Sequence, residues 1–134
     1  MAIPESETDY SCVVELDGVL AGLGFLDVVD GMGQPGMPKG TEAVIGHMLR
    51  PDLTGQGLGT GLVHGLLVAA FDGLGLRRVT AGCNADDVAS ARVLEKNGMR
   101  REQHGIQDSW HAELGWVDGY TYAMLRHEWE AGSR

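Results

Sequence analysis

The feature that most constrains this 134-residue chain is a cluster of glycines at Thr54–Gly61 that runs directly into an apolar segment. Glycine allows a backbone to approach a ligand closely, and the first turn of a helix presents unpaired N–H groups that attract anions. In the apolar segment, Leu62–Leu74, hydrophobic residues recur at the spacing of a helix that packs on a sheet. The cluster therefore predicts a strand-to-helix turn that can hold a phosphate group.

Two common phosphate-binding motifs do not fit this cluster. A P-loop needs lysine and Ser or Thr directly after its last glycine, whereas Leu62 follows Gly61. The dinucleotide-binding motif G-x-G-x-x-G also fails, because counting from Gly55 places Thr60 at its last position and counting from Gly57 places Leu62 there. The cluster alone leaves its ligand open, and a tight turn without any ligand is equally compatible with it.

The composition limits the partners and the compartment. Ten basic residues against nineteen acidic ones give a formal net charge of −9, which predicts that neither nucleic acid nor membrane is a partner. Cys12 and Cys83 lack C-x-x-C spacing and the histidines lack ligand spacing, so we expect free thiols and no metal site. There is no signal-peptide pattern and no run of membrane-spanning length, so we expect a cytoplasmic protein.

The remaining patterns predict a single α/β domain over residues 1–134. Asp17-Gly18 is a hairpin turn signal between two expected strands, Ser11–Leu16 and Val19–Val29. Residues 30–40, rich in glycine and proline, are expected to form an exposed loop. Further strands are expected at Glu42–Leu49, Arg78–Cys83, Met99–Asp108 and Val117–Arg126, with helices after Gly57 and after Asp87, the second ending at Asn97-Gly98.

Four segments, in this order, resemble the GNAT N-acetyltransferase superfamily and within it the RimJ/RimL-like branch. Ala43–Pro51 is similar to its central strand, Gly55–Thr60 to its pyrophosphate loop, Asp87–Met99 to its N-x-x-S-x-x-V-x-x-K-x-G-F helix, and Trp116–Leu125 to its closing strand. The resemblance implies an α/β (α+β) fold: a GNAT-like mixed, mostly antiparallel sheet with helices on both faces. It also implies an enzyme that transfers an acetyl group from acetyl-CoA to a primary amine, either a protein N-terminus or a small amine. A non-catalytic module that binds CoA or a partner is the alternative.

The same resemblance implies which residues bind acetyl-CoA. The central strand and the strand after the first helix splay apart in this family, and the pantetheine arm lies between them. A backbone N–H near Met48 or Leu49 is expected to stabilise the oxyanion, and the second helix is expected to contribute Asp87 and Ser90. The expected backbone contacts to the arm and to the pyrophosphate come from Met48, Leu49, Arg50, Gly55, Gln56, Gly57, Leu58, Gly59 and Thr60.

The catalytic residues are predicted less directly. Many members use a tyrosine as the acid for the leaving thiolate, but that position is Leu94, so Ser90 is the candidate, with helix capping or a CoA hydrogen bond as its alternative role. Asp108 is the candidate base if a bulge or register shift turns it into the cleft. Glu42 and a water relay are the alternatives. Residues expected on the acceptor side are His47, His104, Trp110, His111 and the loop at 30–40.

Two departures from the family pattern matter. Asp87 replaces the asparagine that caps the second helix, so a carboxylate lies near an anionic cofactor and we expect weaker affinity. The family's first strand and two helices have no counterpart, so the fold is expected to be N-terminally truncated. Either the sequence begins inside a longer protein, or a second subunit covers the exposed sheet edge, and a homodimer is the preferred expectation.

Overall fold

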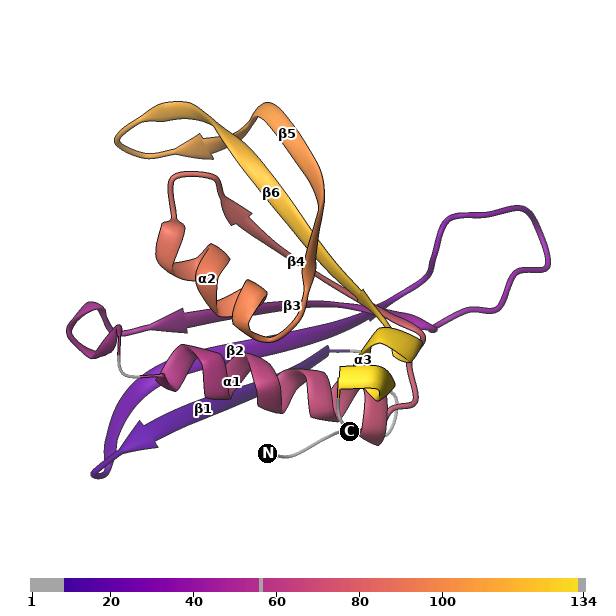
Figure 1. Ribbon diagram of the computed structural model, residues 1–134, viewed down its shortest axis with the longest axis horizontal. Coiled ribbons are helices and arrows are strands. Elements are labelled where there is room, and N and C mark those ends of the chain that lie inside the picture. The colour runs from indigo at the N-terminus through magenta and orange to yellow at the C-terminus, as the bar shows by residue number, and fades with distance from the viewer. Residues whose placement is uncertain (1–8, 56, 133–134) are drawn as a thin grey trace.

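The computed structural model describes residues 9–55 and 57–132, which form one six-stranded sheet (Figure 1). Its strands lie in the order β1-β2-β3-β4-β6-β5. Only the β3–β4 pair is parallel, because α1 crosses over between these two strands. The mixed, mostly antiparallel sheet predicted from the sequence is therefore confirmed. The strands are β1 (Asp9–Leu16), β2 (Val19–Val29), β3 (Glu42–Leu49), β4 (Arg78–Asn84), β5 (Arg100–His111) and β6 (Gly115–Leu125).

The helices are α1 (Leu58–Val68), α2 (Val88–Lys96) and α3 (Arg126–Gly132). A single wider turn, η2 (Ala69–Gly73), extends α1 at its end. Helix α1 packs on β2 and β3, while α2 packs on β4 and β5 and also contacts α1. Helix α3 joins this layer through Trp129, whose ring stacks on Phe71 with centroids 5.7 Å apart. None of the helices in the described ranges is long and apolar enough to cross a bilayer.

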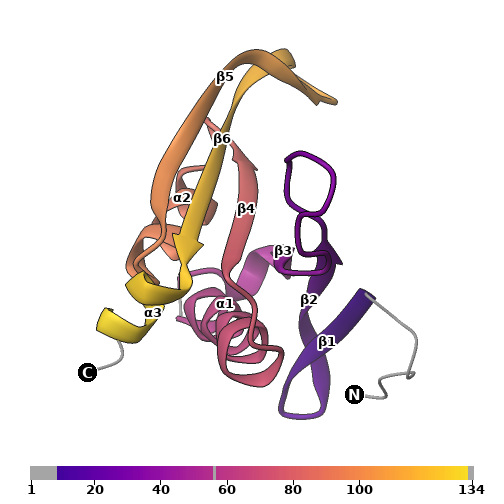
Figure 2. The same cartoon turned by 90° about the vertical axis from the view of Figure 1, so that its right-hand side faces the viewer.

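The helices cover one face of the sheet (Figure 2). Along the central strands, Ile45 and Val79 point toward the helices and are buried at 2% and 0% exposure. Side chains on the opposite face of β1, β2 and β3 are exposed, because no helix in the described residues lies over them. The predicted placement of helices on both faces is therefore wrong for this part of the chain. The apolar side chains exposed on that face are Val13, Leu23, Phe25, Val44 and Met48.

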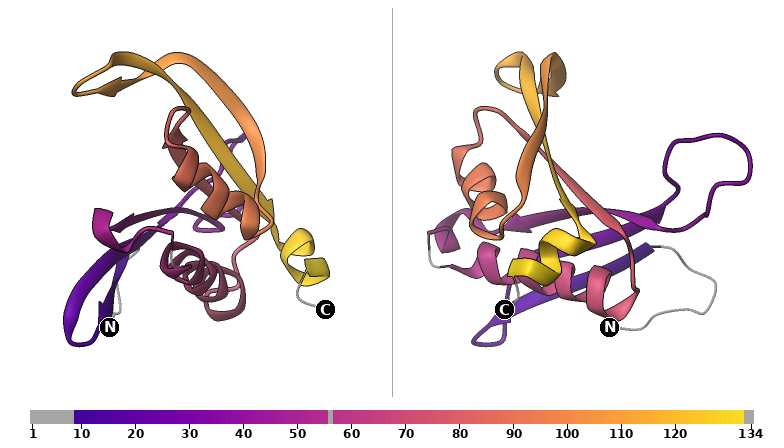
Figure 3. Two further views of the ribbon diagram at one scale, coloured as in Figure 1. Left: turned by 60° about the vertical axis from the view of Figure 1, so that its left-hand side comes forward. Right: turned by 45° about the vertical axis from the view of Figure 1, so that its right-hand side comes forward.

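Local signals placed several boundaries correctly. Asp17 and Gly18 have φ values of 53° and 78°, the conformation of a tight hairpin turn between β1 and β2. Gly98, with φ of 84°, ends α2 in the left-handed region, as predicted. The β5–β6 hairpin extends further than expected, to His111 and from Gly115, and curves over α2 (Figure 3). Its tip carries two exposed tryptophans.

Candidate functional site

The parallel strands β3 and β4 separate halfway along their length. Their pairing ends at Ile45 and Ala81, although β3 continues to Leu49 and β4 to Asn84. Beyond that point β3 pairs only with β2 and β4 only with β6 among the described strands. A gap therefore opens between the two central strands, as the family resemblance implies.

The hydrogen-bonding pattern determines which backbone groups face this gap. The Arg50 N–H donates to the carbonyl of Ala21 on β2 at 2.9 Å. Because the direction of backbone groups alternates along an antiparallel ladder, those of Met48 also point toward β2, while those of His47 and Leu49 point into the gap. The backbone groups that face the gap are therefore those of His47 and Leu49, and not those of Met48 and Arg50, from which the contacts were expected. The Arg50 guanidinium is also occupied, by the Asp52 carboxylate at 2.8 Å.

A cavity of about 610 Å³ lies beside this gap, between the end of β3 and the first turns of α1 and α2. Its wall combines the glycine loop, the end of β3 and one side of α2. Leu58 faces a separate apolar groove, and Gln56 lies outside the described residues. The residues that line the cavity are His47, Met48, Leu49, Thr54, Gly55, Gly57, Gly59, Thr60, Asp87, Val88, Ala89, Ser90, Arg92, Val93 and Lys96.

The glycine loop brings the start of α1 close to β3. Gly55 and Gly57 have φ values of 82° and 79°, which side-chain-bearing residues rarely adopt, and Gly57 is the N-cap of α1. No side chain of the described residues caps this helix, so its first-turn N–H groups remain available to an anion. Gly59 is buried, and a Cβ there would lie 3.2 Å from Leu49 Cδ1 and 3.3 Å from Val93 Cγ2. Glycine at this position therefore allows α1 to approach both neighbours.

Asp87 begins α2 and holds Ser90. Its carboxylate accepts hydrogen bonds from the Ser90 backbone N–H at 3.1 Å and from the Ser90 hydroxyl at 2.7 Å. The predicted capping role of Asp87 is confirmed. The Ser90 hydroxyl hydrogen points at Asp87 in this arrangement, so it must rotate before Ser90 can donate a proton to a ligand.

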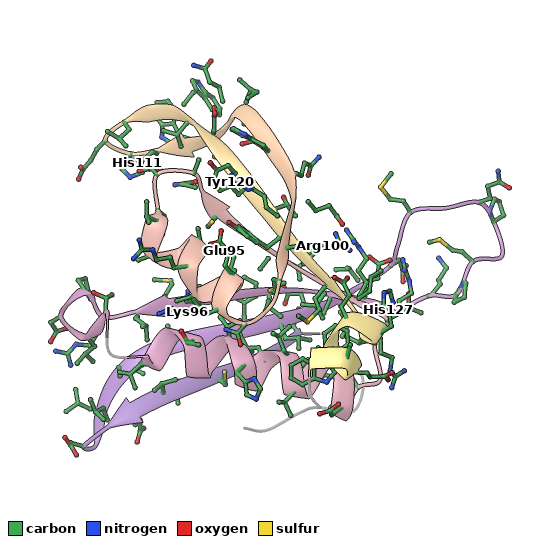
Figure 4. All side chains as sticks on the ribbon, in the orientation of Figure 1. Glu95, Lys96, Arg100, His111, Tyr120 and His127 are labelled. Atoms are coloured by element: carbon green, nitrogen blue, oxygen red, sulfur yellow. The ribbon has the colours of Figure 1, made fainter. Side chains whose placement is uncertain are left out.

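Arg92 and Lys96, which are not among the predicted site residues, bring positive charge to this acidic protein's cavity. They lie four residues apart and therefore share one side of α2. Neither forms a salt bridge with any residue in the described ranges. In Figure 4, Lys96 lies between α2 and α1. Their four-residue spacing on the predicted second helix was the available sequence signal.

His47, which was expected on the acceptor side, is half-buried in the wall of this cavity. Burial lowers the pKa of its imidazole below the usual value of 6.5, and the negative charge of Asp87 opposes this shift. At neutral pH the imidazole is therefore mostly uncharged.

The two carboxylates considered as bases lie outside this cavity. A register shift between Gly105 and Ser109 does occur, but the Asp108 carboxylate is exposed and folds over Gly105 and Gly119. Glu42 forms ion pairs with Arg77 and with Arg78, the latter at 3.4 Å, at the opposite end of β3. Neither Asp108 nor Glu42 therefore lines this cavity, and the role of Asp108 as a base stays a prediction.

The other residues expected on the acceptor side lie on the β5–β6 hairpin. His104 Nε2 lies 2.7 Å from an Asp118 carboxylate oxygen, and its ring contacts Tyr120 edge-on at 5.0 Å. Trp110 and Trp116 contact each other edge-on at 5.3 Å and remain exposed. His111 lies near the hairpin tip (Figure 4). The structure gathers these aromatic residues on one hairpin and leaves them outside the cavity wall.

Known proteins share both the sequence pattern and the fold. Residues 1–100 match the family described as acetyltransferase (GNAT) domain. An uncharacterized N-acetyltransferase, YnaD of Bacillus subtilis (strain 168), is 32% identical over 85 residues, which are 63% of this chain and 49% of the relative. The chain thus matches about half the length of this curated relative.

Two solved structures illustrate the shared fold. A GNAT-family acetyltransferase from Bacillus anthracis is 25% identical with a TM-score of 0.68, over 90% of this chain and 67% of that one. A ribosomal-protein-S5-alanine acetyltransferase from Vibrio fischeri is 18% identical with a TM-score of 0.74, over 91% of this chain and 64% of that one. With the split strands, the glycine loop and the capped second helix all in place, the chain belongs to the GNAT acetyltransferase family.

Proposed function

We propose that this chain is an N-acetyltransferase that transfers the acetyl group of acetyl-CoA to a primary amine. The observation that carries the proposal is the cavity of about 610 Å³ beside the split between β3 and β4. The gap offers unpaired backbone groups along one side of a strand, and the cavity offers an uncapped helix start. An extended amide-containing arm with a phosphate at its end has matching chemistry.

The cofactor would lie with its phosphates at the start of α1. The backbone N–H groups of Gly57 to Thr60 would bind the pyrophosphate, with Gly55 and Gln56 completing the loop. Arg92 and Lys96 supply cations on the facing wall, and their lack of acidic partners in the described chain supports this role. The negative charge of Asp87 repels the phosphates, so we expect modest affinity for acetyl-CoA.

The chemistry requires few protein groups. A neutral amine attacks the thioester carbonyl, and the backbone N–H of Leu49, which faces the gap, is positioned to stabilise the oxyanion. Ser90 is the proposed proton donor to the departing sulfur, after its hydroxyl rotates away from Asp87. Asp108 has no part in this proposal because it lies away from the cavity.

The proposed acceptor is a primary amine on a protein N-terminus or a small molecule. The net charge of −9 favours the approach of a cationic acceptor. The V. fischeri structure is described as acting on the alanine of ribosomal protein S5, which makes an alanine N-terminus one reasonable probe. Spermidine is a second probe, because it offers primary amines and positive charge.

Free-thiol release with acetyl-CoA and a panel of amines tests the proposal. The panel contains spermidine, a peptide that begins with alanine, and the same peptide with a blocked N-terminus as control. We expect release above the acceptor-free rate with at least one primary amine and none with the blocked peptide. CoA binding without turnover would instead favour the alternative, a non-catalytic CoA-binding or partner-binding module, and an absence of CoA binding would exclude both.

The proposal includes a homodimer in the cytoplasm. Strand β1 is one of the two edge strands of the described sheet, and apolar residues such as Leu23 and Phe25 are exposed on the uncovered face. Both features favour association with a second copy. Cys12 and Cys83 are free thiols, which suits a reducing compartment. Light scattering during size-exclusion chromatography measures the mass directly, and a monomer at micromolar concentration would contradict the dimer.

A further inference from the structure

We propose that His47 is the base that accepts the proton of the attacking amine, an inference that rests on the proposed function. His47 lies on β3 just beyond Ile45, where pairing with β4 ends. Its backbone faces the gap and its side chain lines the cavity, together with Ser90. The position therefore combines access to the proposed thioester site with a group that can take up a proton.

The surroundings of the imidazole are defined by three elements. His47 shares its face of β3 with Ile45 and Leu49, the face on which α1 packs. His47 Cδ2 lies 3.9 Å from the position that a Cβ on Gly59 would occupy, so the ring lies against the first turn of α1. This contact holds the ring at the cavity wall, half-buried but accessible to a ligand in the cavity.

Burial favours the neutral form of the imidazole against the charge of Asp87. Helix α2 contributes Asp87, Arg92 and Lys96 to the cavity, while the first turn of α1 contributes no titratable side chain. Burial lowers the pKa of His47 and only Asp87 opposes it. A neutral imidazole retains one unprotonated nitrogen, which is the form a general base needs near pH 7.

The other carboxylates near the site are unsuitable for this role. Asp87 already accepts two hydrogen bonds from Ser90. Asp108 and Glu42 do not line the cavity, and Glu42 is ion-paired with Arg78. Among the described residues that line the cavity, His47 is therefore the side chain best suited to accept a proton at neutral pH.

The proposed step transfers the acetyl group to the amine and moves one proton to His47. The amine nitrogen forms a bond to the thioester carbonyl carbon, and the carbon–sulfur bond breaks with its electron pair going to sulfur. One proton moves from the amine nitrogen to the His47 imidazole, which becomes an imidazolium. The Ser90 hydroxyl gives one proton to the sulfur, which becomes the free thiol of CoA. Ser90 then regains a proton from water, and His47 releases its proton to water. The products are the amide and CoA.

The pH dependence of His47→Gln against wild type tests this role. Both proteins are assayed with acetyl-CoA and the same amine, so ionisation of the acceptor cancels in the ratio of their kcat/KM values. We expect this ratio to rise through the pKa of His47 and to level off at roughly a hundredfold or more. Acetyl-CoA affinity, measured by calorimetry, should change little. Exposed His127→Gln is the matched control and should leave the ratio near one.

Chemical rescue distinguishes a catalytic role of His47 from a structural one. Free imidazole should restore part of the activity of His47→Ala, which a purely structural role would not allow. A ratio that is constant with pH, or a loss confined to the KM for acetyl-CoA, would overturn the inference while leaving the acetyltransferase function intact. Wild type that binds acetyl-CoA but acetylates no amine would also overturn it, and failure to bind CoA at all would overturn the proposed function as well.

A measurement on the wild-type protein alone tests the inference even if the variants do not fold. Nuclear magnetic resonance of the imidazole signals reports the protonation of His47 directly. In the acetyl-CoA complex at pH 7 we expect a neutral ring. A ring that remains protonated at pH 7 in this complex would overturn the inference, whatever the variants do.

Discussion

The side-chain amide of Asn97 donates to the carbonyl of Thr60 at 3.2 Å and to the carbonyl of Val93 at 2.9 Å. Thr60 belongs to the first turn of α1 and Val93 to α2, and both line the cavity. One partly buried amide therefore ties the two helical walls of the proposed cofactor site together. The sequence motif predicts a helix end at Asn97-Gly98, but not this contact across thirty-seven positions.

Asn97→Asp should weaken acetyl-CoA binding. The carboxylate cannot donate, and it would face two carbonyl oxygens, so the walls should separate; we expect affinity to fall by about five- to a hundredfold. Calorimetry measures the change. Gln103→Glu, on the exposed part of β5, introduces the same charge outside the cavity and is the control. Unchanged affinity in a variant with a lowered melting temperature would assign Asn97 to stability alone.

Arg92→Ala and Lys96→Ala should each weaken CoA binding by roughly three- to tenfold, with a larger effect at low salt. Both cations face the cavity without an acidic partner in the described chain. Binding of S-acetyl-pantetheine, which lacks the phosphates of CoA, should not change. Lys39→Ala removes the same charge from the exposed loop and is the control. Equal losses with both ligands would show that these residues do not contact phosphate.

Asp87→Asn should tighten acetyl-CoA binding. The amide oxygen can still cap α2, while one negative charge leaves a cavity proposed for an anion, so we expect roughly a fivefold gain. Titrations at low and high salt should show the gain shrinking as salt rises. An affinity that is the same for both proteins at low salt would mean that the Asp87 charge does not act on the cofactor.

Ser90→Ala should lower kcat by roughly ten- to a thousandfold with little change in acetyl-CoA affinity, if the hydroxyl donates to the departing sulfur. Its backbone N–H would still bind Asp87, so α2 should keep its cap. Steady-state kinetics and calorimetry on one preparation separate the two effects. Parallel losses of kcat and affinity would assign Ser90 to binding.

Much of the fold follows from local sequence signals. The turn at Asp17-Gly18 and the capping of α2 by Asp87 are set by residues that are neighbours in sequence, and both predictions were correct. The placement of the described helices on one face of the sheet was not predicted, because it depends on which helices are present to cover each face. Strand alternation in β2 and β3 allows either face to be covered, since both carry apolar side chains such as Leu23 and Leu26.

The site was predictable where a motif is contiguous and not where distant elements meet. The glycine loop and Ser90 were identified from short patterns. Arg92 and Lys96 line the cavity because α2 packs beside α1, and His47 lines it because the first turn of α1 lies against β3. The position of Asp108 depends on the shift between Gly105 and Ser109, which changes the register of β5 in a way that strand periodicity does not reveal.

Protonation of the Glu102 carboxylate should lower the stability of the protein in acid. Hydrogen bonds from Arg78 and then Arg100 lower the pKa of Glu102 from 4.5 to about 2. A folded-state pKa below the unfolded value stabilises the fold above about pH 4.5, and this contribution is lost as the pH falls toward 2. Glu102 is part of a network that joins β4, β5 and α3 through Arg78, Arg100 and Glu128.

Urea unfolding of wild type and Glu102→Gln at pH 7 and pH 3 measures this contribution. The side chain is 32% exposed, so solvent screening limits the expected difference in pH dependence to about 1 kcal/mol. Wild type should lose more stability than the variant between these pH values. Identical losses would show that the ion pairs contribute nothing to the folded state.

Titration of acetyl-CoA into the wild-type chain, followed by calorimetry, tests the central claim most directly. The split between β3 and β4, the uncapped start of α1 and the cations of α2 predict one molecule bound per chain, with an affinity that weakens as salt rises. The phosphate-free S-acetyl-pantetheine should bind more weakly. No binding of acetyl-CoA at millimolar concentration would contradict the account.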